Sequence, residues 1–143
     1  MQIFDSGCWI FYIQGKPKFD DNKIGKWMHF FEDKDYDRVS ELCRNTVEDG
    51  VVLEAKHSDG NNKGTYENNV ACFYLECDDM ERHKKVIRFF LDNDMIRKTE
   101  TGKLHNISFK LDNQTYAGEY GENYHGHIKL EQFLDLQTGN WLE

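Results

Sequence analysis

Several features are missing from this sequence, and each absence excludes a class of protein. The apolar runs are a handful of residues long, far below the ~20 that a membrane-spanning helix needs. Asp5 interrupts the apolar residues at the start, so we expect no secretory signal. The four cysteines form no CxxC pair, and no repeat or low-complexity tract occurs. We therefore expect a cytoplasmic protein with free, mostly buried thiols.

Positive charge is also scarce. Lysine and arginine total 18 against 26 acidic residues, which gives a net charge of -8. A net negative charge would repel the phosphate backbone of a long nucleic acid, although a local basic pocket is a remaining alternative. We expect no extended nucleic acid as a partner.

The length and the aromatic content indicate one folded domain. The chain has 143 residues, close to the commonest domain size, and 14% of them are aromatic. This is too much apolar surface for a disordered chain. We expect residues 1–143 to form a single domain.

Apolar periodicity predicts the elements. Residues rich in β-branched and aromatic side chains predict strands at 8–13, 26–32, 51–57, 70–77, 107–111 and 116–120. Helical spacing predicts a helix that begins after Asp33 or Asp35 and ends at Gly50, and a second helix that Asp78 and Asp79 cap. Residues 128–136 fit a short helix within a C-terminal lid, 122–143.

This order predicts an α+β fold. We expect a curved antiparallel β-sheet with two main helices packed on one face, plus the short C-terminal helix. Because the helices cover one face, the opposite face and the strand ends are where we expect a ligand.

Two lysines are the strongest candidates for binding chemistry. Lys56 and Lys110 each end an apolar predicted strand. If those strands are neighbours, the two ammonium groups could hold one phosphate; the alternative is two surface lysines. Further candidates for the ligand face are Trp9, Trp27, His57 and Tyr116, although large aromatic side chains in strands more often belong to the core.

A metal site has weak support. His125 and His127 flank one glycine and would share a face on a strand, but zinc needs further ligands that the sequence does not announce. The glycines at 60 and 64 lack the spacing of a phosphate-binding loop. We expect no cofactor and no metal.

The ordered set of motifs resembles a known family. The set consists of GKWMHFF at 25–31, EDG at 48–50, EAKHS at 54–58, VACFYLECDD at 70–79, ISFK at 107–110 and QTYAGEYG at 114–121. Over residues 9–121 the chain resembles the basophilic-leukaemia-expressed-protein-like family, whose members are labelled phosphothreonine lyase domain proteins. The resemblance implies the fold of the mRNA-cap-binding initiation factor, an eIF4E-like fold, but a fold does not carry a function with it.

The same resemblance implies a phosphate pocket without the reaction. Lys56 and Lys110 fall where the bacterial phosphothreonine lyases place phosphate-holding arginines. Met28 stands where those lyases have their catalytic lysine base, and 8–13 lacks their lysine and histidine pair. Without a base to take the α-proton, β-elimination has no first step.

Three functions follow as hypotheses. The first is a non-enzymatic binding domain for a phosphorylated ligand, such as a nucleotide, a phosphopeptide or a nucleic-acid end, held at Lys56 and Lys110. The second is an acidic interaction protein, of the kind that viruses and phages encode as inhibitors, which occludes a basic partner surface. The third is a residual lyase or metal hydrolase that would depend on Lys56 or His125.

Overall fold

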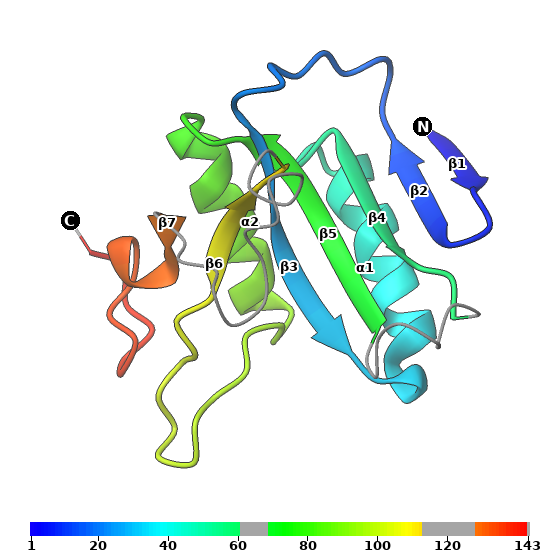
Figure 1. Ribbon diagram of the computed structural model, residues 1–143. Coiled ribbons are helices and arrows are strands. Elements are labelled where there is room, and N and C mark those ends of the chain that lie inside the picture. The colour runs from blue at the N-terminus through cyan, green and yellow to red at the C-terminus, as the bar shows by residue number, and fades with distance from the viewer. Residues whose placement is uncertain (61–68, 113–127, 143) are drawn as a thin grey trace.

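A computed structural model describes residues 1–60, 69–112 and 128–142 (Figure 1). Within these ranges one antiparallel sheet has the strand order β1-β2-β4-β5-β3-β6-β7 and is not closed. Its strands are β1 (Gln2–Asp5), β2 (Trp9–Ile13), β3 (Ile24–Phe31), β4 (Glu54–Ser58), β5 (Asn69–Glu76), β6 (Ser108–Leu111) and β7 (Ile128–Lys129). Helices α1 (Tyr36–Glu48) and α2 (Met80–Asp92) lie on one face of the sheet (Figure 1). The predicted α+β class is therefore confirmed.

The core lies between the sheet and the two helices. Helix α1 turns its predicted apolar stripe toward the sheet and buries Val39, Leu42, Cys43 and Val47. Helix α2 buries Val86, Ile87 and Phe90 in the same layer. Among the described residues, no helix is both long enough and apolar enough to cross a bilayer.

Of the two aspartates predicted to cap the second helix, Asp79 is confirmed, whereas the Asp78 carboxylate accepts a hydrogen bond from Lys23 Nζ at 2.8 Å. The Asp79 carboxylate accepts the backbone N–H of Arg82 at 3.1 Å at the start of α2. Asp35 precedes α1 but makes no capping bond through its side chain. Asp33 lies in the turn before the N-cap position, and its carboxylate accepts the Asn69 side-chain amide at 2.7 Å, which ties the start of β5 to this turn.

Strand β4 begins later than the sequence predicts. The backbone N–H groups of Val51 and Val52 donate to the Thr46 carbonyl at 2.9 and 3.3 Å. These residues therefore satisfy the end of α1 rather than pairing in the sheet. Gly50, with φ of +73°, makes the predicted left-handed turn between α1 and this segment.

The C-terminal segment contains less helix than expected. Residues 128–136 form the short strand β7, a single 3-10 turn η3 (Leu130–Gln132) and turns on either side of Leu134. Leu134 pairs with Trp141 in an isolated bridge, and this pairing replaces further helical turns. Leu130 and Leu134 are buried, so the segment does pack against the core as predicted. The strand predicted at 116–120 lies outside the described residues.

Candidate functional site

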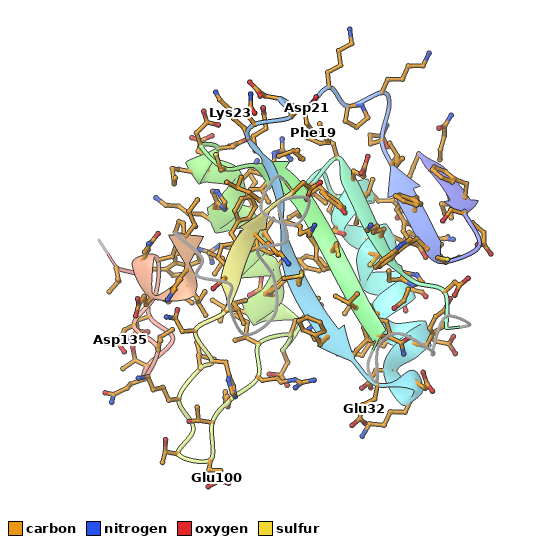
Figure 2. The ribbon with its side chains drawn as sticks, in the orientation of Figure 1. Phe19, Asp21, Lys23, Glu32, Glu100 and Asp135 are labelled. Atoms are coloured by element: carbon orange, nitrogen blue, oxygen red, sulfur yellow. The ribbon has the colours of Figure 1, made fainter. Side chains whose placement is uncertain are left out.

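The face of the sheet opposite α1 and α2 carries the predicted lysines, and we call it the lysine face. Side chains alternate between faces along a strand. Since Ala55 and His57 of β4 are buried toward the helices, Lys56 between them points to the lysine face. Through the register, Lys56 lies beside Phe11 of β2 and Cys72 of β5. Sticks drawn on the ribbon show side chains along the central strands (Figure 2).

Three lysines gather on this face, and we call Lys26, Lys56 and Lys110 the lysine cluster. Lys26 of β3 stands directly opposite Lys110 of β6 and, on its other side, opposite Tyr74 of β5. The ammonium nitrogens of Lys26 and Lys56 lie 5.9 and 5.8 Å from the centroid of the Tyr74 ring. Two of the three lysines therefore lie beside Tyr74, which is itself buried.

Lys56 and Lys110 do not stand on neighbouring strands, which corrects the condition attached to the phosphate hypothesis. Strands β5 and β3 separate β4 from β6, so the two lysine backbones are about 14 Å apart across the sheet at the usual strand spacing. Lys26 fills the space between them. Alternation in KWMHFF, with Lys26 and Trp27 on opposite faces, was the sequence signal that could have identified this third lysine.

The lysine cluster has close charged and aromatic neighbours. Lys26 Nζ forms a salt bridge of 2.8 Å with Asp112 Oδ1, and the two side chains are 13% and 19% exposed. Lys56 Nζ lies 3.8 Å from the Trp9 ring centroid, a short cation–π contact. Lys110 is 9% exposed.

Burial makes these cations costly. Burial lowers the pKa of Lys56 and of Lys110, and the nearby charge of Lys26 lowers both further. Burial raises the pKa of Glu54, although Lys56 opposes this shift. Burial also raises the pKa of the Cys72 thiol to about 11, against the lysine charges. The three lysines thus share this face with the carboxyl groups of Asp112 and Glu54.

Trp9 lies on the lysine face as expected, but Trp27 does not. Trp27 is completely buried on the helix-covered face. Its indole N–H donates to His83 Nδ1 at 3.0 Å, and its ring packs against Phe109. Placing Trp27 on the ligand face was therefore wrong, because it occupies the strand position next to Lys26 and faces the other way.

His57 is also a core residue and not a ligand-face residue. It is completely buried, and its Nδ1 donates to the Ser58 carbonyl at 2.8 Å. This fixes Nε2 as the acceptor, which lies 3.1 Å from the hydroxyls of both Tyr12 and Ser40. The ring thereby joins β2 and β4 to α1 beneath the sheet.

The remaining candidate residues lie in a part of the chain that the structure does not describe. Tyr116, His125 and His127 lie outside the described residues. Within residues 1–60, 69–112 and 128–142, no group of three or more histidine, cysteine or acidic residues could hold a metal ion.

A cavity of about 310 Å³ lies away from the lysine cluster, at the end of α2. The Phe90, Leu104 and Thr138 side chains belong to its lining, with Asp94 and Lys98 as charged members. One acid and one base bring no excess of positive charge. The cavity therefore fits a phosphate less well than the lysine face does.

Comparisons with protein families and with curated proteins identify no relative. No protein-family model matches the chain, and no curated protein matches it either. The family resemblance seen in the sequence motifs therefore stays a prediction.

Proposed function

We propose that this chain is a non-enzymatic binding domain for a phosphorylated ligand, whose phosphate rests on the lysine cluster. The observation that carries the proposal is the placement of three lysines on one face: Lys26 and Lys56 both lie near the Tyr74 ring, and Lys110 stands directly opposite Lys26. The whole chain has a net charge of -8, so a local group of three lysines departs from its average composition. Lysine binds phosphate as a point charge with three donors.

The energetics of the cluster favour an anion as the ligand. Burial lowers the pKa values of Lys56 and Lys110, and the charge of Lys26 lowers both further, so each ammonium group is less favourable here than in water. A phosphate dianion would offset the repulsion among the three ammonium groups and form charge-assisted hydrogen bonds with them. Its binding would therefore recover free energy that the free protein has lost.

The neighbouring side chains favour a ligand that joins phosphate to a planar ring. Trp9 lies beneath the Lys56 ammonium, and Phe11 is 5.6 Å from the same nitrogen. Aromatic side chains beside a phosphate site can stack a base. We therefore favour a nucleotide within the class of phosphorylated ligands.

The family resemblance agrees with binding rather than catalysis. It assigns Lys56 and Lys110 to phosphate-holding positions, and it puts Met28 where the lyases have a base. Met28 stands opposite Cys72 on the lysine face, and a thioether does not accept the α-proton. We also propose that the sheet and its two helices are a version of the cap-binding initiation factor fold.

Removing two lysines should abolish ligand binding. We expect the double variant Lys56→Met, Lys110→Met to lose at least about a hundredfold in affinity for adenosine 5′-monophosphate, because two charged hydrogen bonds disappear. Methionine keeps much of the apolar stem, which limits the damage to packing. Titration calorimetry, with thermal unfolding as a check on folding, measures the change.

Lys23→Met is the matched control. Lys23 lies at the rim of the sheet near Asp21 and pairs with Asp78 in an exposed salt bridge (Figure 2). This variant removes one positive charge from the chain without touching the cluster. Equal binding by the double variant and the wild type would refute the phosphate site, and equal losses in both variants would show only a long-range charge effect.

Removing the carboxylate beside Lys26 should have the opposite effect. Asp112 holds the Lys26 ammonium at 2.8 Å and competes with an anionic ligand for it. We expect Asp112→Asn to bind the nucleotide several-fold more tightly, because the local positive charge rises. Calorimetry at two salt concentrations checks this. Unchanged affinity would show that Lys26 does not bind the phosphate of the nucleotide.

A second candidate function is binding to a basic partner surface. The Asp59 N–H donates to the Cys8 carbonyl at 3.1 Å, which places Asp59 at the turn that follows Asp5. After burial, the charges of Asp59, Asp5 and Asp37 raise the pKa of Tyr36. They lie near the β1–β2 turn and the start of α1. This acidic region favours the interaction hypothesis.

A further inference from the structure

The outer edge of β1 presents backbone groups that the sheet does not use. In an antiparallel pair, successive residues direct their N–H and C=O groups alternately toward and away from the neighbouring strand. The Ser6 N–H donates to the Trp9 carbonyl at 2.9 Å, so the backbone groups of Ser6 face β2. By alternation the backbone groups of Phe4 also face β2, whereas those of Ile3 and Asp5 face away from the sheet. Among the described strands, none lies beyond β1.

The hairpin that carries this edge is held in place. The Asp5 carboxylate accepts the Gly7 N–H at 2.7 Å, and the Ser6 hydroxyl accepts the Trp9 N–H at 3.2 Å. The Phe4 ring stacks on Phe11 of β2, with centroids 4.9 Å apart and planes at 11°. An incoming strand would therefore meet a preformed template, and little conformational entropy would be lost in ordering it.

The edge lacks two of the protections that natural sheet edges often have. Lysine, proline and bulges commonly prevent pairing at such edges, and β1 (QIFD) contains neither lysine nor proline. Ile3 and Phe4 are 43% and 45% exposed. The edge at β7 differs, because that strand has two residues and runs into the turn η3.

The two faces of β1 differ in charge. Ile3 pairs with buried Tyr12, so Ile3 and Asp5 lie on the helix-covered side. Asp5 lies next to the β1–β2 turn, where the Asp59 N–H donates to the Cys8 carbonyl at 3.1 Å. After burial, the charges of Asp59, Asp5 and Asp37 raise the pKa of Tyr36. Phe4 lies on the other side, where the next strands carry Phe11 and Lys56.

Asp5 is the charged residue of β1, whose other three residues are Gln2, Ile3 and Phe4. Negative charge is thus concentrated at the Asp5 end of β1. A strand added to this edge would lie beside a carboxylate at one position, Asp5, and not along its whole length.

We propose that β1 is the docking edge for an extended segment of a partner protein, which adds as a further strand. The segment places a basic side chain beside Asp5, on the helix-covered side, and an apolar side chain beside Phe4, on the other side. Main-chain hydrogen bonds to Ile3 and Asp5 supply affinity, and the two alternating side chains supply selectivity. A second copy of this chain is a poorer occupant, because it would bring its own Asp5 and a net charge of -8.

A short peptide tests the edge directly. The probe is a capped seven-residue peptide in which valine alternates with arginine, and its control has glutamate in place of arginine. We expect the arginine peptide to shift the amide signals of Ile3 and Asp5 in NMR titrations, and the glutamate peptide to shift neither. No shift with about 1 mM arginine peptide, a concentration that detects even weak binding, or shifts confined to other residues, would overturn the proposal.

Two variants separate strand addition from general attraction. Ile3→Pro removes an outward N–H, which β2 does not need, and should weaken peptide binding about tenfold, whereas Ile3→Val should not. Asp5→Asn with Asp37→Asn should weaken it by a similar factor, and the asparagine carbonyl that replaces the Asp5 carboxylate can still accept the Gly7 N–H. Equal affinity for the Ile3→Pro and Ile3→Val proteins would show that the peptide does not pair with β1.

Two further measurements set the alternatives apart. Sedimentation of the peptide-free protein should show a monomer; a dimer that Ile3→Pro dissociates would assign the edge to a second copy and overturn the peptide proposal. The Lys56→Met, Lys110→Met protein should bind the arginine peptide as the wild type does. This measurement shows whether the peptide site at β1 and the phosphate site are independent, so that one proposal can be refuted without the other.

Discussion

Replacing Gly25 with alanine is expected to lower the free energy of unfolding by about 3 kcal/mol, the upper part of the range for overpacked cores. A Cβ atom at Gly25 would lie 2.5 Å from Phe109 Cζ and 2.6 Å from the Lys110 carbonyl oxygen. The ring could turn aside, but the carbonyl belongs to the backbone of β6. Alanine therefore forces β6 away from β3, where Gly25 pairs with Leu111.

Urea denaturation of the Gly25→Ala protein measures this loss. The double variant Gly25→Ala, Phe109→Leu is the informative comparison, because it clears the ring and leaves the carbonyl in place. We expect incomplete rescue relative to Phe109→Leu alone. A loss below about 1 kcal/mol in the single variant would mean that β6 moves at little cost, a result at odds with its close packing on β3.

Acidification should destabilise the protein through its buried histidines. Burial lowers the pKa of His57 and of His83 below the value of about 6.5 that each has in the unfolded chain. The unfolded chain therefore takes up protons first as the pH falls. The stability is complete above about pH 6.5 and is lost as the pH falls toward the folded-state values. Each histidine contributes a slope of up to about 1.4 kcal/mol per pH unit in that window.

His83→Gln isolates one of these contributions. The neutral His83 ring accepts the Trp27 N–H at Nδ1 and donates from Nε2 to the Cys77 carbonyl at 2.9 Å. Protonation would place a second donor against the indole N–H. Glutamine supplies one acceptor and one donor but does not titrate. We expect a less stable protein at about pH 7.5 whose stability falls less steeply between about pH 6.5 and 5, and an unchanged slope would contradict the role of His83.

The elements of this fold were predictable because their patterns are local. The spacing of Val39, Leu42 and Cys43 predicts the buried stripe of α1, and Gly50 predicts its end, as the structure confirms. Strand β1 was missed because QIFD is short and mixed and none of its four residues is buried. A strand at the edge of a sheet needs no apolar face, so it leaves a weak signal.

The candidate site was less predictable, because it depends on strand order and on the starting residue of each strand. Reading 51–57 as one strand did not show which of Lys56 and His57 faces the helices. That choice follows from the packing of Ala55 and His57 beneath α1. The separation of Lys56 from Lys110 by two strands is likewise a property of the topology, which no local pattern contains.

The strand order also determines how the protein can assemble. Strand β3 lies between β5 and β6, both of which follow it in the chain after a helix. The pairs Trp27–Phe73 and Trp27–Phe109 thus bring together residues that are distant in the sequence. Such non-local contacts slow folding, because loops must close before the contacts form. The indole of Trp27, packed against His83 and Phe109, would consequently report the completion of the central sheet during refolding, after the local helices have formed.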